Sequence, residues 1–246
     1  MIDEIGDFLN HSGIPIFGTA KARTLTEVPA EFSPQSIMKG ARSVLCFAVP
    51  TPKGIIQAEN NFSLLYWRFC NISYRFLDSV ANGLCLLLEQ KGFTAAPVYS
   101  CFPWKVLENR FYGLMPLVWW ARECGIARLT PCGLAGNSRF GVRLLLGGVI
   151  SGAEFENTGA PVPDPCPPDC ALCRESCPVG AIDRTGRVDH NRCVRHSGAN
   201  PLLANLLADK SIVAKFGFET LLNTVSVDDH GMYTCSECLR ACPLNR

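Results

Sequence analysis

The feature that most constrains this chain is a pair of cysteine runs in its last third. Residues 166–178 follow the pattern C-x3-C-x2-C-x3-C-P, and residues 235–243 follow C-x2-C-x3-C-P. A single cysteine, Cys193, lies between the two runs. Thiols spaced this closely usually bind a metal, and the bonds to that metal then contribute directly to the folding free energy.

Both runs end in the C-x3-C-P step with which bacterial-type ferredoxins hold cubane iron–sulfur clusters. Thiolates are soft ligands that suit iron–sulfur chemistry. Zinc or disulfides are the alternative, but zinc usually takes two C-x2-C hooks without a trailing Cys-Pro. We therefore predict two [4Fe-4S] clusters in this part of the chain.

The spacing also predicts which cysteines share a cluster, because in two-cluster ferredoxins the fourth cysteine of a run ligates the other cluster. Cys193 is the cysteine nearest in sequence that can complete the second set. The two predicted ligand sets are Cys166, Cys170, Cys173 and Cys242 for the first cluster, and Cys177, Cys193, Cys235 and Cys238 for the second.

The first loop has one residue more than usual, since three residues separate Cys166 from Cys170. Pro167 and Pro168 stiffen this loop. We expect the extra residue to bulge outward. If it does not, the first cluster would be a three-iron or labile form.

Composition limits the setting in which these thiols work. The chain has 246 residues, is 48% hydrophobic and carries a net charge of +1, so it can bury a core and shows no overall bias toward nucleic acid or acidic membranes. Its acidic N-terminus, interrupted by Gly6, lacks a secretory pattern. No apolar run approaches the ~20 residues of a membrane span. We predict a cytoplasmic protein, in an anaerobic setting, whose fourteen cysteines are reduced.

Hydrophobic periodicity predicts a mixed α/β segment upstream. We expect helices over residues 2–12, 61–91 and 117–124, strands over residues 43–49, 96–101 and 143–151, and mostly loop over residues 14–40. In the long helix the predicted buried stripe is Leu65, Phe69, Ile72, Phe76, Val80, Leu84 and Leu87, and Asn60 or Asn61 can cap its start. Cys46, Cys70 and Cys85 are interpreted as packing residues.

Five prolines between residues 157 and 168 predict a linker. We therefore predict an N-terminal α/β (α+β) domain over residues 1–160 and a small ferredoxin-like double-cluster domain over residues 161–246. Helices are expected over residues 201–208 and 212–222. Four arginines around Cys193 lie either in a solvated loop or on a docking surface for an acidic partner: Arg184, Arg187, Arg192 and Arg195.

The residues then point to a family. The lone middle cysteine with the closing C-x2-C-x3-C-P run resembles epoxyqueuosine reductase and the reductive dehalogenases. Three upstream stretches are similar as well: residues 43–50, residues 121–128 (Ala-Arg-Glu-Cys-Gly-Ile-Ala-Arg) and residues 137–144 (Asn-Ser-Arg-Phe-Gly-Val-Arg-Leu). The chain is most similar to short members of this family, which lack a C-terminal repeat extension.

The resemblance implies that the α/β domain binds cobalamin and that two cubane clusters feed it single electrons. It implies cofactor-binding roles for Arg128, Cys132 and Arg143. Thr130-Pro131-Cys132 stands where the family has Gly-Lys-Asn, and the family's proton-donating Asp has no clear counterpart. The nearest ionisable group is Tyr112, which we take as the candidate catalytic residue.

The function that this resemblance implies is that of an oxidoreductase, namely a corrinoid-linked reductase in which the clusters act as an electron relay. Two alternatives stay open: an electron-transfer or reductive-activation protein for a partner's corrinoid, without cobalamin of its own, and an iron–sulfur sensor. The expected partners are a low-potential electron donor (ferredoxin or flavodoxin) and a small-molecule substrate or a corrinoid protein. We expect no membrane partner and no tRNA partner.

Overall fold

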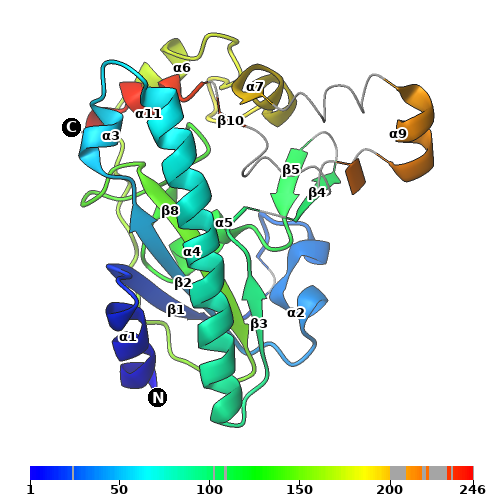
Figure 1. Ribbon diagram of the computed structural model, residues 1–246. Helices are drawn as coiled ribbons and strands as arrows, with labels where there is room; N and C mark the ends of the chain where they lie inside the picture. The colour runs from blue at the N-terminus through cyan, green and yellow to red at the C-terminus, as the bar shows by residue number, and fades with distance from the viewer. Residues whose placement is uncertain are drawn as a thin grey trace.

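The structure, a computed structural model, describes residues 1–23, 25–101, 103–107, 110–199, 209–217, 220–221, 232–233 and 235–245. A four-stranded antiparallel sheet lies at its centre, with the strand order β1-β2-β8-β3. The strands are β1 (Ile16–Lys21), β2 (Ser43–Pro50), β8 (Leu144–Ser151) and β3 (Ala95–Val98). The predicted mixed α/β architecture is confirmed (Figure 1).

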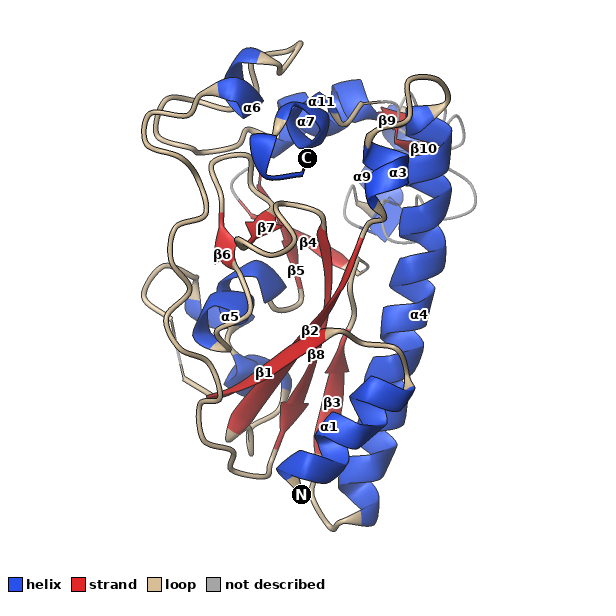
Figure 2. Cartoon of the chain, turned by 90° about the vertical axis from the view of Figure 1, so that its left-hand side faces the viewer, coloured by secondary structure: helices blue, strands red, loops and turns tan. Residues whose placement is uncertain are grey.

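Helices cover both faces of this sheet, which is why β2 is buried on both sides. Figure 2 shows α1 (Ile2–His11) and α4 (Phe62–Gln90) on one face and α5 (Leu117–Glu123) on the other. Side chains of a strand alternate between its two faces. Accordingly Leu45 and Phe47 pack in the core beneath α4, whereas Val44 and Cys46 pack in the core beside α5.

Shorter elements surround this centre. The N-terminal part adds η1 (Ala30–Phe32), α2 (Pro34–Ile37), α3 (Lys53–Ile56), the hairpin β4 (Trp104–Leu107) and β5 (Arg110–Gly113), and the pair β6 (Arg128–Leu129) and β7 (Ala135–Gly136). The cysteine-rich part contains α6 (Leu172–Glu175), α7 (His190–Ser197), the pair β9 (Gly198–Ala199) and β10 (Met232–Tyr233), α9 (Lys210–Phe216), α11 (Glu237–Ala241) and η2 (Pro243–Asn245).

The long helix exists as predicted, but the first half of its predicted stripe is wrong. Leu65 and Ile72 are 47% and 56% exposed. Leu77 is fully buried instead, so the buried face is turned by about 100°, one residue of helix. The reason lies in the sheet: a Cβ on Gly147 would come within 3.3 Å of the Leu77 side chain, so Leu77 sits where the strand offers space. The second half of the stripe holds at Val80 and Leu84, which are buried.

The region expected to be mostly loop contains strand β1, which the sequence reading missed. Its middle residue Gly18 is the reason that α5 can approach, because a Cβ there would lie 2.1 Å from the Cys124 carbonyl oxygen. Asn61 precedes α4, but its side chain makes no capping hydrogen bond and its φ is +60°. The predicted helix over residues 201–208 lies outside the described residues. Of the predicted 212–222 helix, residues 212–216 lie in α9 and residues 220–221 are helical, while residues 218, 219 and 222 lie outside the described part.

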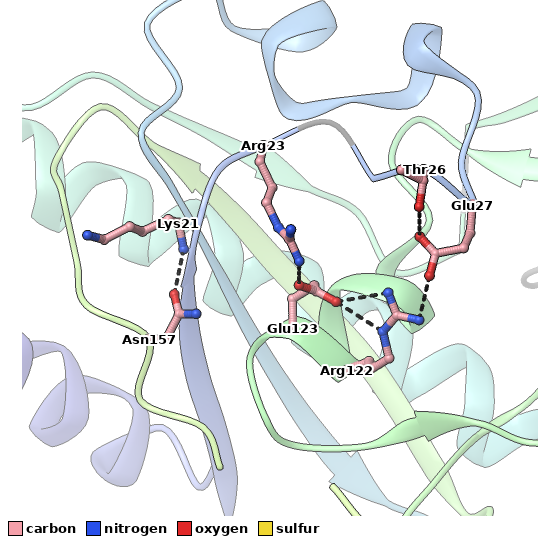
Figure 3. Close-up of polar contacts among 7 residues, drawn as sticks. All are labelled: Lys21, Arg23, Thr26, Glu27, Arg122, Glu123 and Asn157. Carbon is pink, nitrogen blue, oxygen red and sulfur yellow. Dashed lines mark hydrogen bonds and ion pairs between the residues drawn. The ribbon is translucent and has the colours of Figure 1, made fainter. Parts of the chain in front are cut away.

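The proline-rich linker runs along the edge of β1 and is held by side-chain hydrogen bonds. The Thr19 amide donates to Thr158 Oγ1 at 2.8 Å, and the Lys21 amide donates to Asn157 Oδ1 at 2.9 Å (Figure 3). Gly125 has a φ of +69°, and a Cβ there would lie 2.2 Å from the Gly159 Cα, so this crossing requires glycine.

The cysteine-rich segment packs on the α/β part through a common hydrophobic cluster. Phe62 and Val142 contribute to it from the N-terminal side, and Ile182 and Leu239 from the C-terminal side. Asn245 strengthens this junction: it is 1% exposed, and its Oδ1 accepts the Val142 amide at 3.0 Å. The domain boundary at residue 160 therefore stays a prediction. Among the described residues no helix is both long and apolar enough to cross a membrane.

Candidate metal and cofactor site

The fold brings the two cysteine runs together because α6 packs against α11. Cys173 lies in α6, and Cys238 lies in α11. Cys193 lies in α7, between the two runs in sequence. Figure 1 shows these three helices gathered at the end of the molecule where α4 begins.

The thiols of the two cysteine runs and of Cys193 influence one another at this end of the molecule, while their division into two ligand sets stays a prediction. Burial first, then Asp164, then the thiols of Cys242, Cys170 and Cys173 raise the pKa of Cys166 to about 11. The four thiols of the first predicted set also line one cavity, so they lie close together.

Thiols of the second predicted set influence one another as well, and one influence crosses from the first set. Burial, followed by the thiols of Cys193, Cys235 and Cys173, raises the pKa of Cys238 to about 12. Burial and then the thiols of Cys177 and Cys235 raise the pKa of Cys193. Buried thiols gathered like this are poor thiolates by themselves, and a bound cation reverses that preference.

The first set lines a small cavity whose chemistry fits an iron–sulfur cluster. Its donors are soft thiols and its other walls are mainly apolar, an environment that shields a cluster from water. The lining consists of Thr130, Pro131, Cys132, Val142, Cys166, Pro167, Cys170, Cys173, Cys242, Pro243 and Leu244. Across the described ranges, no three His, Cys, Asp or Glu side chains are grouped so that they could hold a single metal ion.

Backbone geometry shows how the longer first loop is accommodated. Asp169, which precedes Cys170, has a φ of +58° and is exposed. Asp169 therefore faces solvent in this loop, and the outward bulge around a bound cluster stays a prediction. In the second set, Cys177 Sγ accepts the Ala181 amide at 3.2 Å, a contact of the kind that tunes cluster potentials.

A second, larger cleft of about 580 Å³ adjoins the thiol cavity. Val142 lines both, so a single side chain contributes to the wall between them. The charged side chains in the cleft lining are Glu27 and Arg187, and most of the rest is aromatic or aliphatic. A broad apolar cleft with a few polar groups is typical of a small-molecule or cofactor site.

The predicted cofactor and catalytic residues are not all in this cleft. Tyr112 lines it and stacks on Phe32, with ring centroids 4.5 Å apart. Cys132 lines the thiol cavity rather than the cleft. Arg128 lies in β6 and is absent from the lining of either space. Arg143 is 6% exposed and its Nη1 donates to the Thr51 carbonyl, so its guanidinium faces the backbone of the α/β part.

Several cleft residues had no recognisable sequence signal. Phe111 donates its amide to His190 Nδ1 at 3.2 Å, so hairpin β4–β5 contacts the first residue of α7. Asp78, on α4, accepts the Ser100 amide at 2.8 Å, and Ser100 lines the cleft. Burial raises the pKa of Asp78. Neither contact could be inferred from the sequence, because each joins residues that are far apart along the chain.

An ion-pair network joins Arg23, Glu27, Arg122 and Glu123 (Figure 3). Arg122 pairs with Glu27 and with Glu123, each at 2.9 Å, and its guanidinium lies 5.1 Å from the Trp119 ring centroid. Glu123 also pairs with Arg23. Since Glu27 and Trp119 both line the cleft, this network holds the segment before η1 against α5.

Comparison with known proteins places this arrangement in a recognised fold. A family model described as NosR matches residues 164–196, which include the first cysteine run and Cys193. No curated protein matches the chain. Solved structures of epoxyqueuosine reductases and reductive dehalogenases share the fold, which confirms the resemblance predicted from the sequence.

Epoxyqueuosine reductase from Streptococcus thermophilus has a TM-score of 0.63 and 18% identity, and the match covers 100% of this chain and 66% of that one. A crystal structure of epoxyqueuosine reductase with a tRNA-Tyr epoxyqueuosine-modified stem loop has a TM-score of 0.63 and 17% identity, covering 99% of this chain and 64% of that one. The catabolic reductive dehalogenase NpRdhA, in complex with 3-bromo-4-hydroxybenzoic acid, has a TM-score of 0.57 and 12% identity. The match covers 98% of this chain and 31% of that one.

The tRNA-bound neighbour contradicts, weakly, our expectation of no tRNA partner. That expectation used the net charge of +1. Net charge describes the whole chain, whereas nucleic acid binds to a local surface potential. The overall charge balance is therefore no ground for excluding tRNA.

Proposed function

We propose that this chain is an iron–sulfur reductase in which two [4Fe-4S] clusters pass single electrons to a corrinoid held in the cleft. The observation that carries the proposal is the shared wall: Val142 lines both the thiol cavity and the cleft. Electrons entering at the thiol sets would then have a short route to whatever occupies the cleft. A corrinoid, when bound, supplies the redox chemistry of its cobalt.

The chain's own residues would bind and orient the reactants. Cys166, Cys170, Cys173 and Cys242 would hold one cluster, and Cys177, Cys193, Cys235 and Cys238 the other. The aromatic rings of Trp104, Phe111 and Trp119 would contact the cofactor and exclude water. Tyr112 would present its Oη as a proton donor in the cleft, a role for which no carboxylate is available in the described lining except Glu27.

The electrons would come from a low-potential donor with an acidic surface, such as a ferredoxin or flavodoxin. This part of the proposal is supported by four exposed arginines near the second thiol set: Arg184, Arg187, Arg192 and Arg195. Opposite charges raise the rate of encounter, and salt screens the effect. Reduction by such a donor should therefore slow as ionic strength rises.

The test of the proposal is a metal analysis followed by a cofactor titration. Anaerobically reconstituted protein should contain about eight irons and eight sulfides, as two cubane sites require, and its brown absorbance should bleach with dithionite. Added cob(II)alamin should then bind with a change in its absorption and paramagnetic resonance spectra. Protein that holds zinc and no labile sulfide would overturn the iron–sulfur assignment.

A matched pair of variants locates the cofactor. Val118→Trp adds a large side chain to the cleft lining, whereas Leu86→Trp adds the same side chain to an exposed position on α4. We expect Val118→Trp to abolish the cob(II)alamin spectral change while keeping both clusters, and Leu86→Trp to leave both properties unchanged. If wild-type protein carries both clusters but gives no spectral change, the alternative is favoured: electron transfer to a corrinoid on a partner protein.

A further inference from the structure

We infer that Cys132 is a reserve ligand of the first iron–sulfur site, able to replace Cys166. The inference rests on the proposed clusters and concerns a residue outside both predicted ligand sets. Cys132 is 8% exposed and lines the same small cavity as Cys166, Cys170, Cys173 and Cys242. This cavity therefore contains five thiols, whereas one cubane cluster takes four protein ligands.

A rigid turn aims Cys132 at this cavity. The Thr130 amide donates to the Leu134 carbonyl at 3.0 Å, and the Gly133 amide donates to the Thr130 carbonyl at 2.8 Å. Thr130 Oγ1 also donates to the Leu134 carbonyl, at 2.8 Å. The hydroxyl proton is thus in use, so the 3.2 Å contact between Thr130 Oγ1 and Cys132 Sγ has the thiol as its donor.

The position of Cys132 relative to the predicted ligands suits ligand exchange. Its side chain lines the same cavity as Cys173, a central member of the first set. The two side chains also pack in one hydrophobic cluster with Cys242. A cluster held by Cys173 would therefore have Cys132 within reach without any rearrangement of α6.

Cys166 is the ligand of the first set that is easiest to replace. It precedes α6 at the end of the proline-rich linker, whereas Cys173 lies inside that helix. Its amide donates to Asp164 Oδ1 at 3.0 Å, so a residue of the linker, and not a helix, positions Cys166. The loop to Cys170 also contains the residue with positive φ, Asp169.

The exchange is balanced without any oxidant or reductant. The bond between one cluster iron and Cys166 Sγ breaks, and this sulfur takes up a proton. The Cys132 thiol loses its proton, and its sulfur forms a bond to the same iron. The number of thiolate ligands, the iron valences and the total charge are all unchanged.

The experiment compares iron content and paramagnetic resonance spectra of anaerobically reconstituted variants. We expect Cys166→Ala to keep two cubane clusters, because Cys132 takes the vacant position. The double variant Cys166→Ala/Cys132→Ala should lose the first cluster or convert it to a three-iron form. The matched control is Cys166→Ala/Cys124→Ala, since Cys124 is 1% exposed and packs in the core outside the cavity; it should behave like Cys166→Ala.

The outcomes separate this inference from the proposed function. Wild-type protein without iron–sulfur clusters would refute the proposed function. Suppose instead that the wild-type protein holds two clusters. Loss of one cluster in Cys166→Ala would then refute only the reserve ligand, and so would retention of both clusters in the Cys166→Ala/Cys132→Ala variant. The spectrum of the second cluster reports whether each variant is folded. Alkylation gives a second readout in the Cys166→Ala variant. Cys132 should resist alkylation while the cluster is present and should react after chelation of the iron. Alkylation of Cys132 with the cluster intact would also refute its role as a reserve ligand.

Discussion

Arg122 is predicted to stabilise the contact between α5 and the segment that contains Glu27, and replacing it with methionine tests this directly. Methionine keeps most of the apolar stem but removes the guanidinium. The lost contacts are the ion pairs with Glu27 and Glu123, both at 2.9 Å, and the interaction with the Trp119 ring at 5.1 Å. The Arg122 side chain is 30% exposed, while Glu27 is 40% and Glu123 is 14% exposed.

The magnitude follows from these exposures. A partly exposed ion pair contributes about 0.2–1 kcal/mol, and salt screens it. A cation–π contact near the surface contributes about 0.5–1 kcal/mol. Two pairs and one ring contact therefore predict a loss of about 1–3 kcal/mol in the free energy of unfolding, measured by urea denaturation at low ionic strength. The control is Arg23→Met, because Arg23 is 64% exposed and its ion pair within the described part of the chain is with Glu123.

The pH dependence of the same variant gives a second measurement. The hydrogen bond from Arg122, then the backbone and Thr26, lower the pKa of Glu27 from 4.5 to about 2. A depressed carboxyl pKa stabilises the fold above the unfolded value of 4.5, and this contribution is lost as the pH falls toward 2. The difference between wild type and Arg122→Met should therefore shrink over that range. If Arg122→Met changes the unfolding midpoint no more than Arg23→Met, or if its effect is independent of pH, the network does not stabilise this segment.

Three further predictions concern the cluster, the cleft and the core. Cys193→Ala should remove or alter the second cluster and leave the first intact in paramagnetic resonance spectra, because the thiolate is itself the bond to iron. The control Cys85→Ala should lower stability without loss of iron. Two unaltered clusters in Cys193→Ala would exclude Cys193 as a ligand. Burial raises the pKa of Asp78 above its ordinary 3.8, so the folded state binds this proton more tightly than the unfolded state. The stability of the wild type should therefore fall relative to that of Asp78→Asn as the pH rises above about 4. Parallel pH profiles of stability for the two proteins would contradict this. Leu77→Ala should lower the free energy of unfolding in urea by about 2–5 kcal/mol, because Leu77 is fully buried. Leu86→Ala, at a site 61% exposed, should lower it by less than about 0.5 kcal/mol. Equal losses would mean that the buried face of α4 is assigned incorrectly.

Local patterns in the sequence determined much of this protein. The apolar run at residues 43–49 predicted the central strand β2, and the spacing of apolar residues predicted the length of α4 closely, because both signals come from neighbours along the chain. The cysteine spacing predicted two ligand sets, because cluster geometry constrains which cysteines of a run can bind the same irons. The structure brings Cys166, Cys170, Cys173 and Cys242 to one cavity, and the two ligand sets stay a prediction.

Only the tertiary structure decided which faces and which side chains meet. Strand β1 lies in a stretch rich in glycine, proline and threonine, and it forms because β2 offers an edge with which it can pair. Leu77 rather than Ile72 is buried because Gly147 leaves space beneath α4. Cys132 lies in the thiol cavity because a turn folds the chain back there, 34 residues before Cys166. Contacts between segments distant in sequence depend on how whole elements pack, so no local pattern of residues could have shown them.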